Sequence, residues 1–316
     1  MKEKLRVKFV DFWVDMNDEK SNFFYKILSK NYHVEFSDTP DVLFYSHFGT
    51  RYMQYPCTRI LYSPENIRPD FSKTDYAISF DFLDDPRHLR MPLWALYYKN
   101  EFAEDENLER KFEEWQNRKN FCCIVVSNEH AKERIDFYKN LNAKIKVDSA
   151  GRWNNNIGKE LLPGTDNKLD FIKDYRFVIS FENSSYPGYT TEKLIEPLMA
   201  GCIPIYWGDP QVGLDFNLKR FISVAGIHQF DDTVKRVIEI ENNKILAKDI
   251  LKEPIFANNK IPVYLRPDYM DETMFSWIEE ARQKRFKGVG SGIKQRMKYF
   301  IVLSKSRLKS VKNKIA

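Results

Sequence analysis

Short apolar runs, rich in β-branched and aromatic residues, recur along the first hundred residues between segments with helical spacing. Residues 5–13, 42–45, 59–62 and 76–80 are predicted as strands, and residues 22–28 as a helix. Strands that are apolar on both faces are typical of a mainly parallel sheet covered by helices on two sides. The first third of the chain is therefore predicted to form an α/β unit.

A second series of strands follows a charged segment, residues 100–119, whose few apolar positions offer only a narrow stripe for burial. New apolar runs begin at residue 121 and recur at residues 177–181 and 202–207, again with helix-like segments between them. A second α/β unit is therefore predicted. The predicted divisions are a first domain, residues 1–117, a second domain, residues 118–281, and a tail, residues 282–316.

One segment, residues 177–210, combines a strand, a polar turn and a helix start; it reads FVISFENSSYPGYTTEKLIEPLMAGCIPIYWGDP. The strand ends at Phe181, and a Glu-Asn pair follows it into the turn. Thr190 or Thr191 can cap the next helix, which Gly201 ends. Ligands in open α/β sheets bind at the carboxyl ends of strands, so this turn is predicted to line a binding site.

The first turn of that helix carries Lys193, although the helix dipole disfavours cations at this end. A bound diphosphate would compensate both the lysine and the free N–H groups, whereas an isolated lysine here more often projects into water. The loop GRWNNNIG, residues 151–158, suits contact with a diphosphate or with guanine, and Arg152 is a candidate ligand there. Lys168, in the polar stretch before the strand, is a further candidate.

Residues 177–210 resemble the signature of the α-1,3/1,4-fucosyltransferases of bacterial type, glycosyltransferase family 10, in which FEN, a Tyr- and Gly-containing turn, TEK, a helix and IPIYWG follow one another. YSPEN at residues 62–66, with residues 73–92 after it, resembles the acceptor-domain segment of that family. VVSNEHAKERIDFY at residues 125–138 resembles its first donor-domain strand and helix. The resemblance implies a GT-B type fold, in which two Rossmann-like domains, one for the acceptor and one for the donor, face each other across a cleft.

The resemblance also implies roles for individual residues. Glu65 matches the general base. The implied donor site consists of Arg134 and Lys193 on the pyrophosphate, Glu192 on donor hydroxyls, and Asn183 and Tyr189 nearby. Taken alone, Glu65 in Pro-Glu-Asn is good turn chemistry, and Arg134 by itself is more often a solvated helix residue.

The implied enzyme is an inverting α-1,3-fucosyltransferase that moves L-fucose from GDP-fucose to the N-acetylglucosamine of an N-acetyllactosamine-type glycan, such as lipopolysaccharide O-antigen. One carboxylate suffices because GDP leaves as a weakly basic phosphate and needs only cationic support, unlike the leaving group of a glycosidase. Two alternatives within enzymes are α-1,4 transfer and transfer of another sugar from a guanine nucleotide in surface polysaccharide synthesis. A non-catalytic protein that binds a GDP-sugar or a glycan is the alternative of another class.

No metal or other cofactor is expected to be required. Asp-x-Asp does not occur, and the five histidines never pair at ligand spacing. Stimulation by a non-essential divalent cation stays open.

The last 35 residues hold 12 Lys or Arg and no Asp or Glu. After a glycine-rich joint, residues 288–292, apolar residues recur close to helical spacing, which is typical of a basic amphipathic helix on an anionic membrane. Disorder and nucleic-acid contact are the rival interpretations, and nucleic acid is not expected. No run of 18 apolar residues occurs, so the protein is expected in the cytoplasm, peripherally attached to the inner face of the membrane.

Overall fold

The computed structural model describes residues 2–13, 20, 22–98, 108–158, 161 and 164–286. Two compact units make up the chain: unit 1 contains the residues up to Met91 and those from Arg266 onward, and unit 2 is Pro92–Leu265. These limits differ from the predicted boundaries at 117/118 and 281/282. The reason is packing, because the helices just after Met91 pack within unit 2 and the last helix packs within unit 1.

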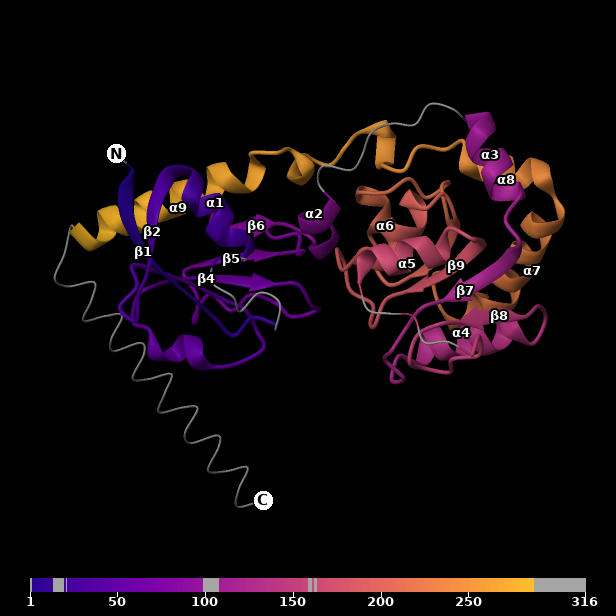
Figure 1. The fold of residues 1–316 in the computed structure, drawn as a ribbon, viewed down its shortest axis with the longest axis horizontal. Helices are drawn as coiled ribbons and strands as arrows, with labels where there is room; N and C mark the ends of the chain where they lie inside the picture. The colour runs from indigo at the N-terminus through magenta and orange to yellow at the C-terminus, as the bar shows by residue number, and fades with distance from the viewer. Residues whose placement is uncertain are drawn as a thin grey trace, which may run out of the picture. The chain divides into compact units, whose positions relative to one another are not determined.

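Unit 1 is built on a parallel sheet in the order β2-β1-β3-β4-β5-β6 (Figure 1). Its strands are β1 (Glu3–Val10), β2 (Tyr32–Phe36), β3 (Val42–Tyr45), β4 (Thr58–Ser63), β5 (Tyr76–Ser79) and β6 (His88–Arg90). Its helices are α1 (Phe23–Asn31), the 3-10 turn η2 (Arg51–Gln54) and α9 (Tyr269–Phe286). Every side chain of β3 and β5 is buried, as the continuous apolar runs predict for inner strands of a parallel sheet.

Helix α9 lies beside α1 on the sheet of unit 1 (Figure 1). Trp277 stacks on Tyr76 of β5 with ring centroids 4.8 Å apart, and its indole N–H donates to the carbonyl of Pro86. Glu279 accepts a 2.7 Å hydrogen bond from the Tyr32 hydroxyl. The predicted tail therefore begins inside this helix, and its part from residue 287 to 316 lies outside the described residues.

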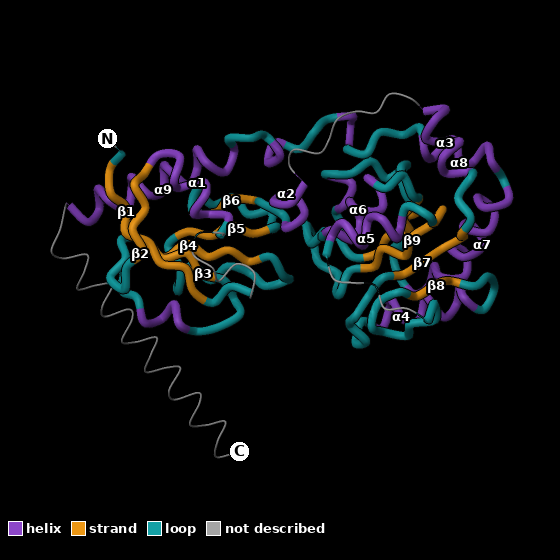
Figure 2. The backbone as a smooth tube through the Cα atoms, in the orientation of Figure 1, coloured by secondary structure: helices purple, strands orange, loops and turns teal. Residues whose placement is uncertain are grey.

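Unit 2 carries a second parallel sheet, in the order β11-β10-β9-β7-β8. Figure 2 labels β7, β8 and β9 among the strands of this sheet. Its strands are β7 (Asn120–Ile124), β8 (Val147–Ser149), β9 (Tyr175–Phe181), β10 (Ile203–Trp207) and β11 (Ile222–Ser223). Its α-helices are α2 (Leu93–Tyr98), α3 (Leu108–Gln116), α4 (Lys132–Asn142), α5 (Thr165–Ile172), α6 (Glu192–Met199), α7 (Phe230–Asn242) and α8 (Lys244–Leu251). Short 3-10 turns are η3 (Val212–Leu214), η4 (Ile227–Gln229), η5 (Ala257–Asn259) and η6 (Val263–Leu265).

Aromatic contacts explain why the segment after Met91 belongs to unit 2. Trp94 of α2 is fully buried, and its ring centroid lies 5.3 Å from that of Phe216 and 5.7 Å from that of Tyr264. Trp115 of α3 lies 5.8 Å from Phe177 of β9 in the same way. Although residues 100–119 are mostly charged, the buried ring of Trp115 attaches α3 to the sheet of unit 2.

The two parallel sheets, one in each unit, confirm the predicted α/β fold class with two Rossmann-like units. Within the described part of the chain, no helix is both long and apolar enough to span a bilayer.

Candidate active site

The buried carboxylate of Glu182 joins three elements of unit 2. It directly follows β9, is fully buried, and accepts hydrogen bonds from the backbone N–H (2.8 Å) and the hydroxyl (2.7 Å) of Thr191, the N-cap of α6. Burial raises its pKa, and the charge of Lys193 opposes that shift. Gly208, after β10, has a φ of +154° and leaves no room for a side chain, because a Cβ there would lie 2.4 Å from Cγ of Glu182.

Lys193 is held by two carboxylates at the start of α6. Its Nζ atom lies 3.5 Å from Glu182 and 3.3 Å from Glu192, and its side chain is 18% exposed. The lysine does not project into water, and the compensating charge expected from a bound anion is already present in these two side chains. Burial favours its neutral form, yet the two carboxylates raise the pKa of Lys193 above its ordinary value, so it stays a cation.

Lys168, on α5, faces two acidic side chains of α6. Its Nζ atom lies 2.5 Å from Glu196 and 3.9 Å from Glu192. The Tyr98 hydroxyl donates to the other oxygen of Glu196 at 2.7 Å. Burial alone would raise the pKa of Glu192, but Lys193 and Lys168 more than offset it and lower that pKa to about 2. Lys168, predicted as a donor ligand, therefore lies in the same charged cluster as Glu192 and Lys193.

Arg134 is buried on α4, contrary to the solvated position that an isolated helix arginine usually takes. Its Nε–H donates to the carbonyl of Phe181 at 3.1 Å, and its Nη2 donates to Oδ1 of Asn183 at 2.5 Å. Desolvation lowers the pKa of Arg134, but a guanidinium stays charged in proteins. The arginine thus fixes the Asn183 side chain at the end of β9 and places a positive charge in contact with it.

Asp209 shapes the turn that precedes α6. It is buried and accepts hydrogen bonds from the N–H groups of Gly188 (2.8 Å) and Gln211 (2.7 Å) and from the Thr190 hydroxyl (3.1 Å). Gly188 has a φ of +83°, a conformation that favours glycine. Tyr189 is buried next to it. The predicted residues Asn183, Tyr189, Glu192 and Lys193 therefore all lie on this turn and the helix it starts.

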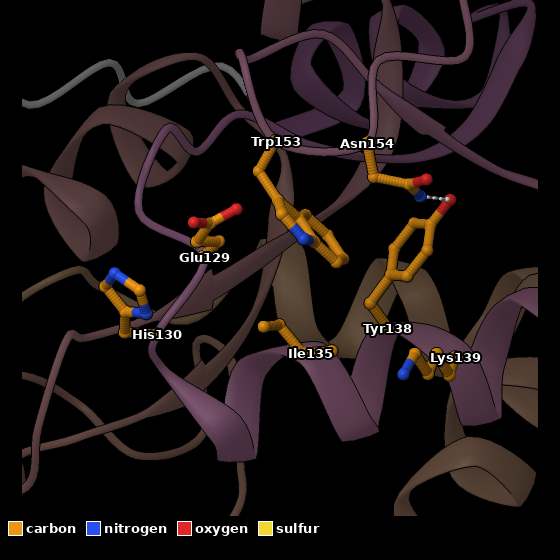
Figure 3. Close-up of a pocket in the computed structure, with 7 residues that line it drawn as sticks. All are labelled: Glu129, His130, Ile135, Tyr138, Lys139, Trp153 and Asn154. Atoms are coloured by element: carbon orange, nitrogen blue, oxygen red, sulfur yellow. Dashed lines mark hydrogen bonds between the residues drawn. The ribbon is translucent and has the colours of Figure 1, made fainter.

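A pocket of about 590 Å³ lies beside α4 in unit 2 (Figure 3). Trp153 and Asn154, from the loop after β8, face Tyr138 of α4; the indole and phenol rings meet edge-on at 5.1 Å, and Asn154 donates to the Tyr138 hydroxyl at 3.0 Å. Glu129 and His130 line another side. The pocket lining includes Trp153 and Asn154 of the predicted loop, whereas Arg152 is exposed and is not among the lining residues.

Glu65 lies in unit 1, in the turn that follows β4. The hydroxyl of Ser63 donates to the carbonyl of Glu65 (3.2 Å) and to that of Ile67 (3.1 Å), which holds the turn closed. The Glu65 side chain is half-buried and acts electrostatically on His47, which follows β3. Glu65 is therefore part of a hydrogen-bonded turn, as its local sequence predicts, and it also carries a carboxylate just after the end of a strand.

Comparison with known protein families shows to which family this chain belongs. Residues 7–97 match the model of the "Alpha-(1,3)-fucosyltransferase FucT N-terminal domain", and residues 115–247 match "Glycosyltransferase family 10 (fucosyltransferase) C-term". The chain belongs to glycosyltransferase family 10. The resemblance predicted from residues 177–210 is confirmed by these matches.

Members of family 10 from bacteria and animals are similar to this chain. The "Alpha-(1,3)-fucosyltransferase FucT" of Helicobacter pylori is 30% identical over 79% of this chain, which spans 60% of that relative's length. A "4-galactosyl-N-acetylglucosaminide 3-alpha-L-fucosyltransferase 9" of Bos taurus is 30% identical over 41% of this chain and 36% of its own length. The crystal structure of an α1,3-fucosyltransferase with GDP-fucose superposes with a TM-score of 0.71 at 27% identity, covering 88% of this chain and 91% of that one.

Glu196 and Tyr98, which contact the charged cluster around Lys168 and Lys193, were not predicted, and Glu182 was predicted to enter the turn but was given no role. Glu182 stands in the FEN motif directly after a buried strand, which was a usable signal. Glu196 stands four residues after Glu192, on the same face of a helix, and could have been paired with it. Nothing in the local sequence of Tyr98 indicates its contact with a helix a hundred residues later. Among the described residues, no three acidic, histidine or cysteine side chains gather in a group able to hold a metal ion.

Proposed function

We propose that this chain is an inverting α-1,3-fucosyltransferase that transfers L-fucose from GDP-fucose to the N-acetylglucosamine of an N-acetyllactosamine-type glycan. The observation that carries the proposal is its similarity, over 88% of the chain, to a structure of an α1,3-fucosyltransferase with GDP-fucose. The charged turn and helix start of unit 2 support it, because they combine cations, the partial positive charge of a helix N-terminus and an ionised carboxylate in one place.

Unit 2 is the proposed donor domain, and the diphosphate is placed at the start of α6. Lys193, whose side chain is 18% exposed, supplies one cation, and buried Arg134 adds a second positive charge while it orients Asn183. The N–H groups of the first helical turn favour an anion by their partial charge. Glu192 stays ionised and can accept hydrogen bonds from fucose hydroxyls, with Tyr189 beside it. This support stabilises the charge that develops on the departing GDP.

The pocket beside α4 is the candidate site for guanine. Its volume of about 590 Å³ lies within the range of small-molecule sites, and Trp153 and Tyr138 offer aromatic surface to a base. Arg152, in the same loop, is placed near the diphosphate or the base. Trp153→Ala should raise the KM for GDP-fucose and leave the acceptor KM unchanged, which steady-state kinetics would measure.

Glu65 is the proposed general base. Inversion requires the acceptor hydroxyl to attack from the face opposite GDP, and one carboxylate within about 2.6–3.2 Å of that hydroxyl can remove its proton. Glu65→Gln keeps the size of the side chain but not its basicity, so transfer should fall by about 10²–10⁴-fold while GDP binding stays intact. Because cations of the chain support the leaving group, the reaction should proceed in EDTA, with any effect of a divalent ion limited to stimulation.

The test is transfer from GDP-fucose to N-acetyllactosamine, followed by NMR analysis of the linkage. Lys193→Met should weaken GDP binding in calorimetry, and Lys173→Met, whose lysine pairs only with exposed Asp170 among the described residues, should not. An α-1,4-linked product would identify the enzyme as an α-1,4-fucosyltransferase. Transfer of a different sugar would show that the donor is another GDP-sugar. Binding of GDP-fucose without any turnover would instead identify a non-catalytic binding protein.

The basic segment, residues 287–316, is proposed to attach the enzyme to an anionic membrane, where a lipopolysaccharide O-antigen acceptor would be assembled. Its support is the sequence alone: basic residues, no acidic ones, and apolar positions at helical spacing. Flotation with phosphatidylglycerol vesicles should carry the full chain, and removal of residues 289–316 should abolish this. Equal flotation with neutral vesicles would argue against the electrostatic attachment.

A further inference from the structure

Three neighbouring strands of unit 1 end at the same edge of its sheet. In the order β2-β1-β3-β4-β5-β6, β1, β3 and β4 are adjacent and parallel, so the residues that follow their carboxyl ends lie together. These residues are Trp13 after β1, His47 and Phe48 after β3, and Glu65 after β4. The edge that carries the proposed base is therefore also an aromatic surface.

The aromatic rings at this edge form a continuous group. The Trp13 ring lies 5.9 Å from the Phe48 ring and 6.0 Å from the buried Tyr62 ring, and the His47 ring lies 4.0 Å from Phe48. Phe48 is nevertheless 51% exposed. A large aromatic side chain that is fixed by two neighbours but open to solvent offers a flat apolar face to a ligand.

His47 has a buried nitrogen that has no partner among the described residues. Its Nδ1 is buried and makes no hydrogen bond to any residue that the structure describes. Burial lowers the pKa of His47, and the charge of Glu65 opposes this shift. A neutral imidazole has one donor and one acceptor nitrogen, either of which suits a hydroxyl group. An unsatisfied polar atom at a site is costly unless a ligand or water completes it.

A pyranose ring has the matching chemistry. One face of the sugar carries mainly C–H groups, and hydroxyls surround its rim, so an aromatic ring binds the face while polar side chains bind the rim. We propose that Trp13, Phe48 and His47 form the subsite that binds the acceptor sugar, with His47 bound to a hydroxyl next to the one that Glu65 deprotonates. This inference rests on the proposed function and adds the residues that position its second substrate.

The test separates acceptor binding from donor binding and from catalysis. Phe48→Leu removes the aromatic face, and its acceptor KM should rise about 10-fold, which corresponds to about 1.4 kcal/mol. Phe48→Tyr keeps the face and should stay within about 2-fold of the wild type. His47→Ala should raise the acceptor KM by about 3–10-fold. For all three variants, the KM for GDP-fucose and its slow hydrolysis without acceptor should not change.

His33→Ala is the matched control, because His33 lies near the amino end of β2 with its side chain 65% exposed. Direct binding is measured by saturation-transfer NMR with N-acetyllactosamine, which does not require turnover. Loss of the saturation signal in Phe48→Leu and its retention in Phe48→Tyr would support the subsite, even for a chain that transfers no fucose. Unchanged acceptor KM and NMR signal in Phe48→Leu and His47→Ala, or an equal rise in the donor KM, would overturn the inference while leaving fucosyl transfer intact.

Discussion

Lys168→Met removes the cation that faces two acidic side chains of α6. Methionine keeps the length and the apolar stem of lysine, so the change is mainly one of charge. Lys168 lies 2.5 Å from Glu196, whose side chain is 3% exposed, and 3.9 Å from Glu192. Without the lysine, Glu196 keeps its hydrogen bond from Tyr98 but loses its only described ion pair.

The expected cost follows from burial. Removing one partner of a buried ion pair costs about 3–5 kcal/mol, because the remaining charge stays desolvated. The Lys168 side chain is 20% exposed, so water screens part of this interaction and the lower figure, about 3 kcal/mol, is expected. Urea denaturation followed by circular dichroism would measure the loss in the free energy of unfolding.

Two further variants test whether the pair of Lys168 and Glu196 is the source of this loss. Lys173→Met removes an exposed lysine next to the end of α5 and should leave the stability unchanged. In the double variant Lys168→Met with Glu196→Gln, neither charge remains, so the combined loss should be smaller than the sum of the single losses by about 1 kcal/mol or more. A Lys168→Met protein as stable as Lys173→Met, or strictly additive losses, would show that the pair contributes no buried electrostatic energy.

Gly208→Ala places a methyl group against Glu182 and strains a positive φ, so thermal unfolding should reveal a loss of about 3 kcal/mol; an unchanged melting temperature would contradict the close contact. The pKa of Glu192 falls from 4.5 to about 2 on folding, so its stabilisation is complete above pH 4.5 and is lost as the pH falls towards 2. Its size is about 3 kcal/mol, and Glu192→Gln should flatten the acid limb of the stability profile; an unaltered limb would assign the loss to other groups. Thr191→Ala removes the cap of α6 and a hydrogen bond to Glu182 and should cost about 2 kcal/mol in urea unfolding, whereas Thr191→Ser should restore most of it; equal losses would argue against the hydroxyl.

The pattern of apolar residues predicted the inner strands well, since strands buried on both faces are continuous apolar runs. β3 has the predicted bounds, β4 is one residue longer than predicted at each end, and β10 begins one residue later than predicted. Short edge strands such as β6 and β11 were not predicted, because two or three residues carry too little periodicity. Cap chemistry predicted helix α6 with Thr190 or Thr191 as its cap, and the structure shows the helix beginning at Glu192 with Thr191 as the cap.

Contacts between residues far apart in the sequence could not be predicted, either in the site or at the boundary between the units. The FEN and TEK motifs indicated Asn183, Glu192 and Lys193, but the contact of Glu196 with Tyr98 depends on how α2 packs, which no local pattern encodes. The boundary near residue 117 was inferred from charge, whereas the buried rings of Trp94 and Trp115 place that segment in unit 2. Polar composition therefore misplaced a segment that a few aromatic side chains anchor.

The return of α9 to unit 1 sets an order for biosynthesis. Trp277, which stacks on Tyr76, is translated after the whole of unit 2. The packing of α9 on the sheet of unit 1 can therefore form only after unit 2 has been synthesised. At about 5–20 residues per second, translation of Pro92–Leu265 takes roughly 10–35 s, during which that apolar surface has no covering helix. A ribosome stalled just after Leu265 would thus present to chaperones a unit 1 sheet that lacks its last helix, although the whole of unit 2 is already synthesised.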